Sequence, residues 1–234
     1  MAVAIVGFDS SRPARLLELL GGPEVPCRVR HVGRVEEVGA VDAVLLCTRD
    51  GREHAAQALP LLARGISVWV DKPLATTEAD ARAMVRAAVD GGLVLACRSG
   101  LRDAPAVRRV AEWVRETPGP VTVRIEGPAP ADNPYGGRAF YGIHHVELAC
   151  ELARSPLHVD GDRLVGADLV AELVFRDDGD FTLTADGASR RVEPPARYLE
   201  DQVTEFLTRV RQGLGTAEPE ALVEPVRLLE HVLG

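Results

Sequence analysis

Residues 68–74 of the sequence read VWVDKPL, an apolar run that ends at a carboxylate, an ammonium and a proline. The run is typical of a buried strand, and Pro73 fixes the turn that follows it. Lys72 is the only lysine among the 27 lysine and arginine residues of the chain. Unlike arginine, a lysine loses its proton readily when it is partly desolvated, so Lys72 is a candidate acid or base. The alternative is an exposed lysine that pairs with Asp71 or with a helix end.

Strands and helices alternate around this stretch over the first hundred residues. Apolar strands are expected at 2–6, 27–32, 43–47, 66–70 and 93–97, and helices at 12–20, 52–64 and 77–89. This alternation predicts an α/β fold, with a Rossmann-like, doubly wound parallel sheet in a domain of residues 1–98. Ligands of such sheets bind beyond the carboxyl ends of the strands, so Gly7, Thr48 and Lys72 are expected to line one crevice.

The second half predicts a smaller α+β domain with an open, mainly antiparallel sheet, over residues 99–234. Strands are expected at 121–126, 168–175, 180–185 and 189–193, and helices at 104–115, 140–152, 198–212 and 221–233. The turns at 177–179 and 186–187 are expected to form hairpins. In the helix at 140–152, His144 and Glu147 share a face, whereas His145 points about a hundred degrees away.

Composition and charge exclude several classes of protein. The net charge of -8 argues against a nucleic-acid partner, which requires a basic face. No apolar run approaches membrane-spanning length, and the first residues lack the basic flank of a signal peptide. The four cysteines show no CxxC spacing, so we expect buried thiols in a reducing cytoplasm, without disulfides.

Three stretches together are similar to one enzyme family. They are residues 42–77 (DAVLLCTRDGREHAAQALPLLARGISVWVDKPLATT), 140–148 (FYGIHHVEL) and 197–213 (RYLEDQVTEFLTRVRQG). The chain resembles the Gfo/Idh/MocA oxidoreductases, with Asp71-Lys72-Pro73 in the place of a Glu-Lys-Pro motif. Gly142 and His144 match a D-x-G-x-H-x-x-D motif of the same family.

The resemblance implies an NAD(P)-dependent oxidoreductase that acts on a small hydroxyl- or carbonyl-bearing, sugar-like substrate. It makes Lys72 and His144 the acid/base pair. The residues assigned to substrate binding are Arg102, His145, Glu147 and Tyr141. The residues assigned to NAD or NADP binding are Gly7, Phe8, Asp9, Ser10, Ser11, Arg12, Thr48, His54 and Asp71. The resemblance also implies a homodimer or homotetramer.

Departures from the family pattern keep two other functions open. Of the G-x-G-x-x-G motif only Gly7 remains, and His31-Val32-Gly33-Arg34 stands where an acidic residue would bind the ribose. Phe140 replaces the aspartate that precedes the family's histidine by four residues. The first alternative is a cofactor-independent isomerase, lyase or cyclase that uses the same Lys and His. The second is a non-catalytic ligand-binding protein.

A metal site is conceivable in the second half of the chain. His144, Glu147 and His158 supply three metal-ligating side chains, but only the first two are clustered. A pair of this kind is more often hydrogen-bonded than metal-bound, so no metal is expected.

Overall fold

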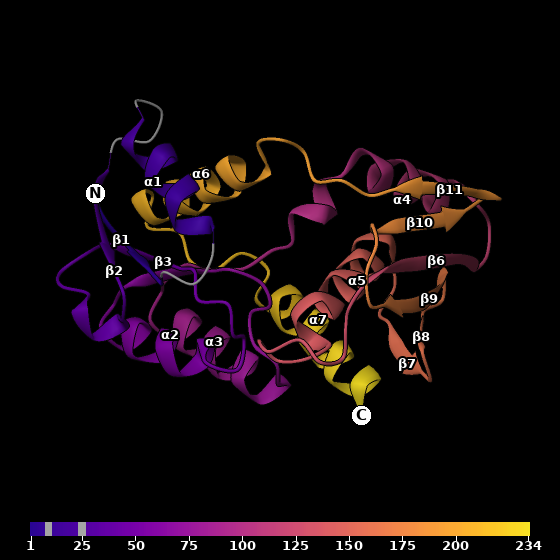
Figure 1. Ribbon diagram of the computed structural model, residues 1–234, viewed down its shortest axis with the longest axis horizontal. Coiled ribbons are helices and arrows are strands. Elements are labelled where there is room, and N and C mark those ends of the chain that lie inside the picture. Colours follow the sequence, from indigo (N-terminus) through magenta and orange to yellow (C-terminus); the bar gives the residue numbers. More distant parts are fainter. Residues whose placement is uncertain (8–10, 23–26) are drawn as a thin grey trace. The chain divides into compact units, whose positions relative to one another are not determined.

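The computed structural model describes residues 1–7, 11–22 and 27–234, and the chain divides into two compact units (Figure 1). Unit 1 comprises Met1–Arg98 and Leu199–Val223, and unit 2 comprises Ser99–Tyr198 and Glu224–Gly234. The assignment of all of residues 99–234 to one domain differs from the structure, because 199–223 group with unit 1. Within the described ranges, no helix combines the length and the apolar character that crossing a membrane requires.

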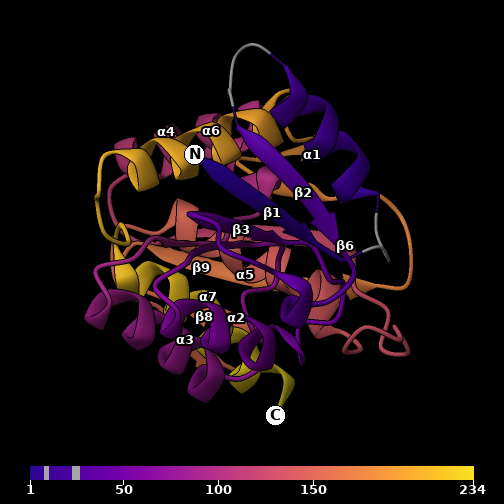
Figure 2. The same cartoon turned by 90° about the vertical axis from the view of Figure 1, so that its left-hand side faces the viewer.

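Unit 1 is built on a five-stranded parallel sheet in the order β2-β1-β3-β4-β5. The strands are β1 Ala2–Val6, β2 Arg28–Val32, β3 Ala43–Leu46, β4 Ser67–Val70 and β5 Leu95–Ala96. The helices are α1 Arg12–Gly21, α2 His54–Ala63, α3 Glu78–Asp90 and, from Leu199 onward, α6 Tyr198–Arg211. Helices α1 and α6 lie on one side of the sheet, and α2 and α3 lie on the other (Figure 2). This architecture confirms the predicted Rossmann-like fold.

The crossover from β2 to β3 is short, as the sequence predicts. It contains only a 3-10 turn, η1 Val35–Glu37, in the place of a full helix. Strand β3 is buried along its whole length, and so is β4, because helices cover both faces of the sheet. Strand β5 is shorter than expected and spans two residues.

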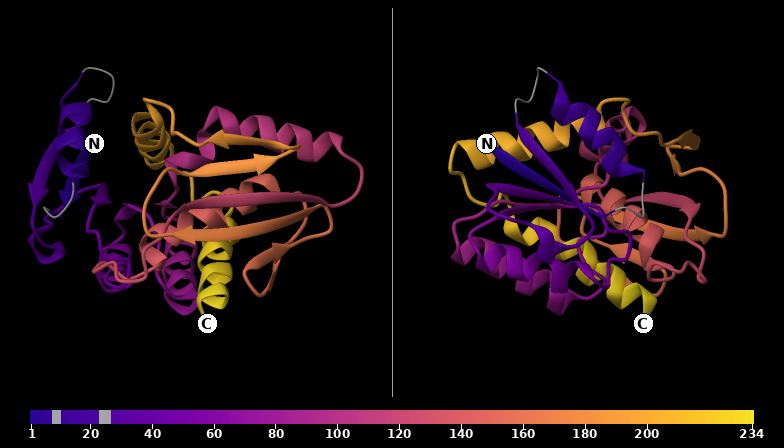
Figure 3. Two further views of the ribbon diagram at one scale, coloured as in Figure 1. Left: turned by 45° about the vertical axis from the view of Figure 1, so that its right-hand side comes forward. Right: turned by 60° about the vertical axis from the view of Figure 1, so that its left-hand side comes forward.

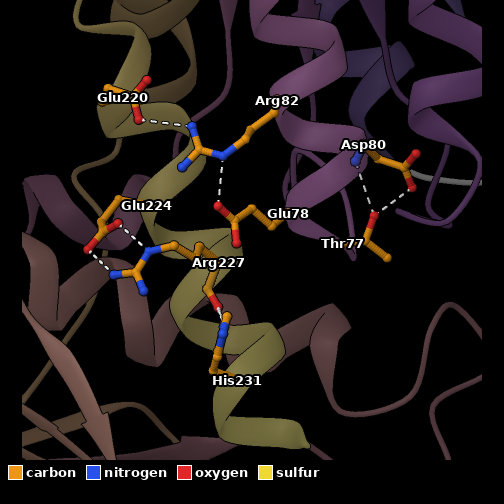
Figure 4. A network of polar contacts seen from close by, with 8 residues as sticks. All are labelled: Thr77, Glu78, Asp80, Arg82, Glu220, Glu224, Arg227 and His231. Carbon is orange, nitrogen blue, oxygen red and sulfur yellow. Dashed lines mark hydrogen bonds and ion pairs between the residues drawn. The ribbon is translucent and has the colours of Figure 1, made fainter.

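Polar contacts hold the segment 199–223 to unit 1. The Thr216 hydroxyl donates to the Leu93 carbonyl at 2.9 Å and accepts from the Leu95 N–H at 2.9 Å, beside β5. At the beginning of α7 (Pro219–Leu233), Glu220 accepts from Arg82 of α3 at 3.3 Å (Figure 4). These contacts join positions more than a hundred residues apart, which local sequence patterns cannot reveal.

Unit 2 contains a six-stranded sheet in the order β11-β10-β6-β9-β8-β7. The strands are β6 Val121–Pro128, β7 His158–Asp160, β8 Arg163–Val165, β9 Leu169–Arg176, β10 Thr182–Ala185 and β11 Ala188–Arg191. Helices α4 Pro105–Glu116 and α5 Ala139–Leu152 pack on one face, and no helix of the described chain covers the other (Figure 3). All pairs are antiparallel except β6 with β9, so the expected mainly antiparallel sheet is confirmed.

Of the two hairpin turns predicted in unit 2, the structure contains one. Asp186 and Gly187 both have positive φ, at 51° and 77°, and they join β10 and β11 as the predicted hairpin. The hairpin predicted at 177–179 is wrong, because β6 lies between β9 and β10. The hairpin of β7 and β8 was not predicted, because each strand has only three residues.

Candidate functional site

Lys72 is the second residue after β4, at the carboxyl edge of the parallel sheet of unit 1. Its side chain is 8% exposed, although it carries an ammonium. The Asp71 carboxylate beside it accepts the Lys72 backbone N–H at 3.0 Å and the Arg12 Nε–H at 3.1 Å. A Cβ at Gly51 would lie 2.6 Å from the Pro73 ring, so the loop before α2 packs tightly on this turn. The turn that carries Lys72 is therefore held from several sides.

His54 was assigned to cofactor binding, and the structure places it in the core. It is fully buried at the beginning of α2, with Nδ1 2.7 Å from the Pro73 carbonyl and Nε2 2.9 Å from the Thr48 carbonyl. A neutral imidazole donates to one of these oxygens at a time. His54 therefore links the ends of β3 and β4, and its burial argues against contact with a ligand.

Gly7 follows β1 at the same edge of the sheet. Its φ is 107°, and a Cβ there would lie 3.0 Å from the Thr48 backbone nitrogen, so only glycine fits. The His31 Nε2–H donates to the Gly7 carbonyl at 2.8 Å. His31 thus has a structural contact at the position where the family has a ribose-binding acid.

The beginning of α1 supplies the remaining cofactor assignments. Ser11 is exposed at the N-cap position and makes no side-chain cap bond. The assignments of Phe8, Asp9 and Ser10 lie outside the described residues. Thr48 donates its hydroxyl to Gln57 at 2.7 Å. The structure thus brings together Gly7 and Thr48, and separately Arg12, Asp71 and Lys72, along one sheet edge.

In unit 2 the second cluster centres on His144 of α5. The Ser99 Oγ lies 2.6 Å from His144 Nδ1, and the Ser99 backbone N–H donates to Glu147 at 2.7 Å. Ser99 and Glu147 are both buried. Glu147 was assigned to substrate binding, but its carboxylate instead holds the residue that contacts the imidazole.

His145 is a core residue, contrary to its assignment to the substrate. It is fully buried, its Nε2–H donates to the Val174 carbonyl at 3.2 Å, and its ring packs edge-on against Phe175 and Phe181. Burial lowers the pKa of His145 to about 4, so the imidazole is neutral at pH 7. Because adjacent residues of a helix point about a hundred degrees apart, His145 points into the core and His144 does not.

Arg102 and Tyr141 keep more accessible positions. The Arg102 Nε–H donates to Glu151 at 2.7 Å, and its side chain is 20% exposed. Burial alone would lower the pKa of Arg102, but the charges of Glu147 and Glu151 more than offset it, and the pKa is raised. The Tyr141 ring centroid lies 6.2 Å from that of His144.

Five of the chain's ten aromatic residues form one connected set of ring contacts that includes the two histidines. They are Tyr135, Phe140, Tyr141, Phe175 and Phe181. Phe181 contacts the His144 ring edge-on, with centroids 5.3 Å apart. Phe181 and Ser99 were not singled out from the sequence. The only signal for Ser99 was its place just after the fifth strand, where ligand-binding residues of such sheets gather.

Each cluster carries one group suited to acid/base chemistry. Lys72 offers a buried ammonium, and His144 offers an imidazole in an aromatic surround. Because Lys72 belongs to unit 1 and His144 to unit 2, their action as a pair stays a prediction.

The chain is similar to known proteins in sequence and in fold. Residues 2–98 match the Gfo/Idh/MocA family model, which is described as "Oxidoreductase family, NAD-binding Rossmann fold". A 1,5-anhydro-D-fructose reductase from Ensifer adhaerens is 41% identical over 155 residues. That match covers 63% of this chain and 40% of the reductase, so the chain spans well under half of this relative.

Solved structures share the fold of the whole chain. A dehydrogenase from Clostridium difficile superposes with a TM-score of 0.76 at 16% identity, covering 100% of this chain and 98% of that one. A 3-ketoreductase from Actinomadura kijaniata, in complex with NADP and TDP-benzene, gives 0.74 at 17% identity, covering 100% and 97%. Residues 2–98 are therefore similar to the Gfo/Idh/MocA oxidoreductase family, and the whole chain has the fold of these two solved structures.

Proposed function

We propose that the protein is an NAD(P)-dependent oxidoreductase acting on a small hydroxyl- or carbonyl-bearing, sugar-like compound. The observation that carries this proposal is the buried Lys72 at the end of β4, inside the segment that matches an NAD-binding family. The similar proteins include a 1,5-anhydro-D-fructose reductase and a 3-ketoreductase, which supports a carbonyl of a sugar-like molecule as the substrate.

The residues present at the end of β1 fit a dinucleotide. The positive φ of Gly7 allows the backbone to turn close to β3, and Ser11 stands without a cap bond at the beginning of α1. A helix N-terminus favours phosphate, and Arg12 adds a guanidinium there. Gly7, Ser11 and Arg12 would hold the pyrophosphate. The nicotinamide, when bound, supplies or accepts the hydride.

The chain's own residues move the proton and place the substrate. Lys72 gives its proton to the carbonyl oxygen during reduction and takes it from the hydroxyl during oxidation. His144 is the second member of the proposed acid/base pair. Tyr141 and Arg102 remain the substrate-binding residues, because His145 and Glu147 are occupied in the core.

The choice between NAD and NADP depends on the end of β2. Arg34 has a side chain that is 80% exposed, which suits a 2′-phosphate, whereas Glu37 lies 3.7 Å away and suits a free ribose hydroxyl. Binding of NAD(H) compared with binding of NADP(H) distinguishes the two.

Nucleotide binding is the deciding experiment. Calorimetry and thermal unfolding with NAD+, NADH, NADP+ and NADPH should show binding and a raised Tm, because a ligand at a hundred times its Kd stabilises by about 2.7 kcal/mol. Arg12→Ala should weaken that binding. Arg15→Ala is the matched control, since Arg15 lies on the same helix and pairs with Glu200. No stabilisation by any of the four at millimolar concentration would exclude the oxidoreductase.

One observation favours a second candidate function. The Arg12 guanidinium, the cation best placed for phosphate, is paired with Asp71. A cofactor-independent isomerase, lyase or cyclase that uses Lys72 and His144 needs no phosphate contact. Turnover without nucleotide would support it, and ligand binding without turnover would support the non-catalytic alternative.

We also propose a cytoplasmic homodimer or homotetramer. The four cysteines are free, which suits a reducing compartment. The helix-free face of the unit 2 sheet is the surface expected to pair subunits. Light scattering coupled to size-exclusion chromatography should give a mass of two or four chains, and a monomer would contradict the assignment.

A further inference from the structure

The Ser99 hydroxyl is buried and contacts two groups. Its side chain is 1% exposed, it accepts the Leu101 N–H at 3.1 Å, and it lies 2.6 Å from His144 Nδ1. An N–H group only donates, so the contact with Leu101 uses the oxygen as an acceptor. The hydroxyl proton of Ser99 must therefore be donated to another group.

We propose that Ser99 is a positioning residue that fixes His144 in the tautomer with its proton on Nε2. The single acceptor that the described residues offer to the Ser99 hydroxyl proton is His144 Nδ1. In the opposite tautomer, Nδ1–H would donate to Ser99, and a buried hydroxyl proton would lose its acceptor. Stranding a buried donor in this way disfavours that tautomer by roughly tenfold or more.

The position of Ser99 is itself held by α5. Glu147, one turn after His144 on that helix, accepts the Ser99 backbone N–H at 2.7 Å. On the other side, Gly100 packs flush against the Tyr198 ring and has no room for a Cβ. The His144 imidazole and the Ser99 hydroxyl are thus both positioned by helix α5.

This inference rests on the proposed function for its chemical meaning. A neutral imidazole with Nε2–H is a hydrogen-bond donor, and it is too weak an acid to give up that proton. During reduction, the carbonyl carbon would take the hydride from the reduced nicotinamide, and the carbonyl oxygen would take the proton from Lys72. His144 would donate a hydrogen bond from Nε2 to that oxygen and stabilise its developing charge. The two residues then have different roles.

The tautomer can be read directly by NMR. A long-range nitrogen–proton correlation spectrum of the full, uniformly nitrogen-15-labelled chain distinguishes protonated from unprotonated ring nitrogens. The spectrum is recorded above the pH at which the rings take a second proton. Subtraction of the His144→Gln spectrum assigns His144 among the six histidines. We expect an unprotonated Nδ1 and a protonated Nε2.

Substitutions test the cause. Ser99→Ala should raise the Nδ1-protonated fraction about tenfold, and Ser99→Thr should restore the wild-type spectrum. Ser155→Ala is the matched control, because that serine donates to Asp168 in the same unit and leaves His144 unchanged. A protonated Nδ1 in the wild type overturns the proposal even if Ser99→Ala does not fold, and so does an unchanged tautomer in a folded Ser99→Ala.

The readout is independent of the proposed function. The spectrum needs neither nucleotide nor substrate, so a protein that fails to bind NAD(P) still shows whether Ser99 sets the tautomer. If nucleotide binding and turnover are present, Ser99→Ala should lower kcat at least fivefold with KM nearly unchanged. A raised KM at constant kcat would instead indicate loss of substrate binding alone.

Discussion

Glu147→Ala should destabilise unit 2 far more than an ordinary surface substitution. The carboxylate is 4% exposed and accepts the Ser99 backbone N–H at 2.7 Å. Removing it strands a buried donor and breaks a charge-assisted bond, which costs about 3 kcal/mol. Glu147→Gln keeps an acceptor but loses the charge, so it should cost roughly 1 kcal/mol. Glu151→Gln is the control, because Glu151 is 32% exposed and its ion pair is worth less than about 1 kcal/mol.

The two tryptophans allow the effect to be localised. Trp69 lies on β4 of unit 1 and Trp113 on α4 of unit 2, so a Trp69→Phe background leaves one reporter in the unit under test. Urea unfolding followed by Trp113 fluorescence should show the midpoint of Glu147→Ala lowered by about 1–2 M, from typical denaturant slopes. A Glu147→Ala midpoint equal to that of Glu151→Gln would refute the buried carboxylate as an anchor for Ser99.

Lys72→Arg should keep the fold and abolish turnover, because arginine does not release its proton; full activity in that variant would remove Lys72 from the mechanism. Burial lowers the pKa of His145 to about 4 from the ordinary 6.5. As the pH falls, the unfolded chain therefore takes up this proton before the folded chain does. The neutral, buried His145 contributes roughly 3 kcal/mol to the free energy of unfolding. This contribution is fully present above about pH 6.5 and is lost as the pH falls toward 4. The dependence of the urea midpoint on pH across this range should become weaker in His145→Leu but not in the exposed control His158→Gln. An equal pH dependence in the two variants would contradict burial of His145 as the cause. Gly100→Ala should cost roughly 1–3 kcal/mol because its Cβ overlaps the Tyr198 ring. Thermal unfolding should show a much smaller cost in a Tyr198→Ala background, and an undiminished cost would exclude this clash.

The sequence predicts those features of the structure that depend on residues close together in the chain. The alternation of strands and helices gave the parallel sheet, because buried apolar runs separated by helical periodicity have few other solutions. Lys72 could be placed at a strand end because Asp71 and Pro73 mark the turn. The three-residue spacing placed His144 and Glu147 on one face of α5, and the structure has both contacting Ser99.

What escaped prediction depends on contacts between distant positions. Strand β6 lies between β9 and β10 through pairings about fifty residues apart, so the adjacent predicted strands did not form a hairpin. His145 entered the core because Phe175 and Phe181, on later parts of the chain, close over it. Thr216 joined its segment to unit 1 through two hydrogen bonds beside β5. No pattern in the surrounding sequence marks any of these partners.

The adjacent histidines of α5 show how an environment divides two identical side chains between structure and chemistry. His145 is fully buried, with Nε2–H bonded to a carbonyl and a pKa lowered to about 4, so it stays neutral and cannot exchange a proton near pH 7. His144 is only partly buried, its Nδ1 lies 2.6 Å from the Ser99 hydroxyl, and the backbone N–H of Ser99 donates to Glu147. A serine partner orients a ring without adding charge, whereas the aspartate that Phe140 replaces would favour the charged imidazolium. The absence of that aspartate and the presence of Ser99 both favour the proposed neutral His144, which would donate a hydrogen bond while Lys72 carries the proton.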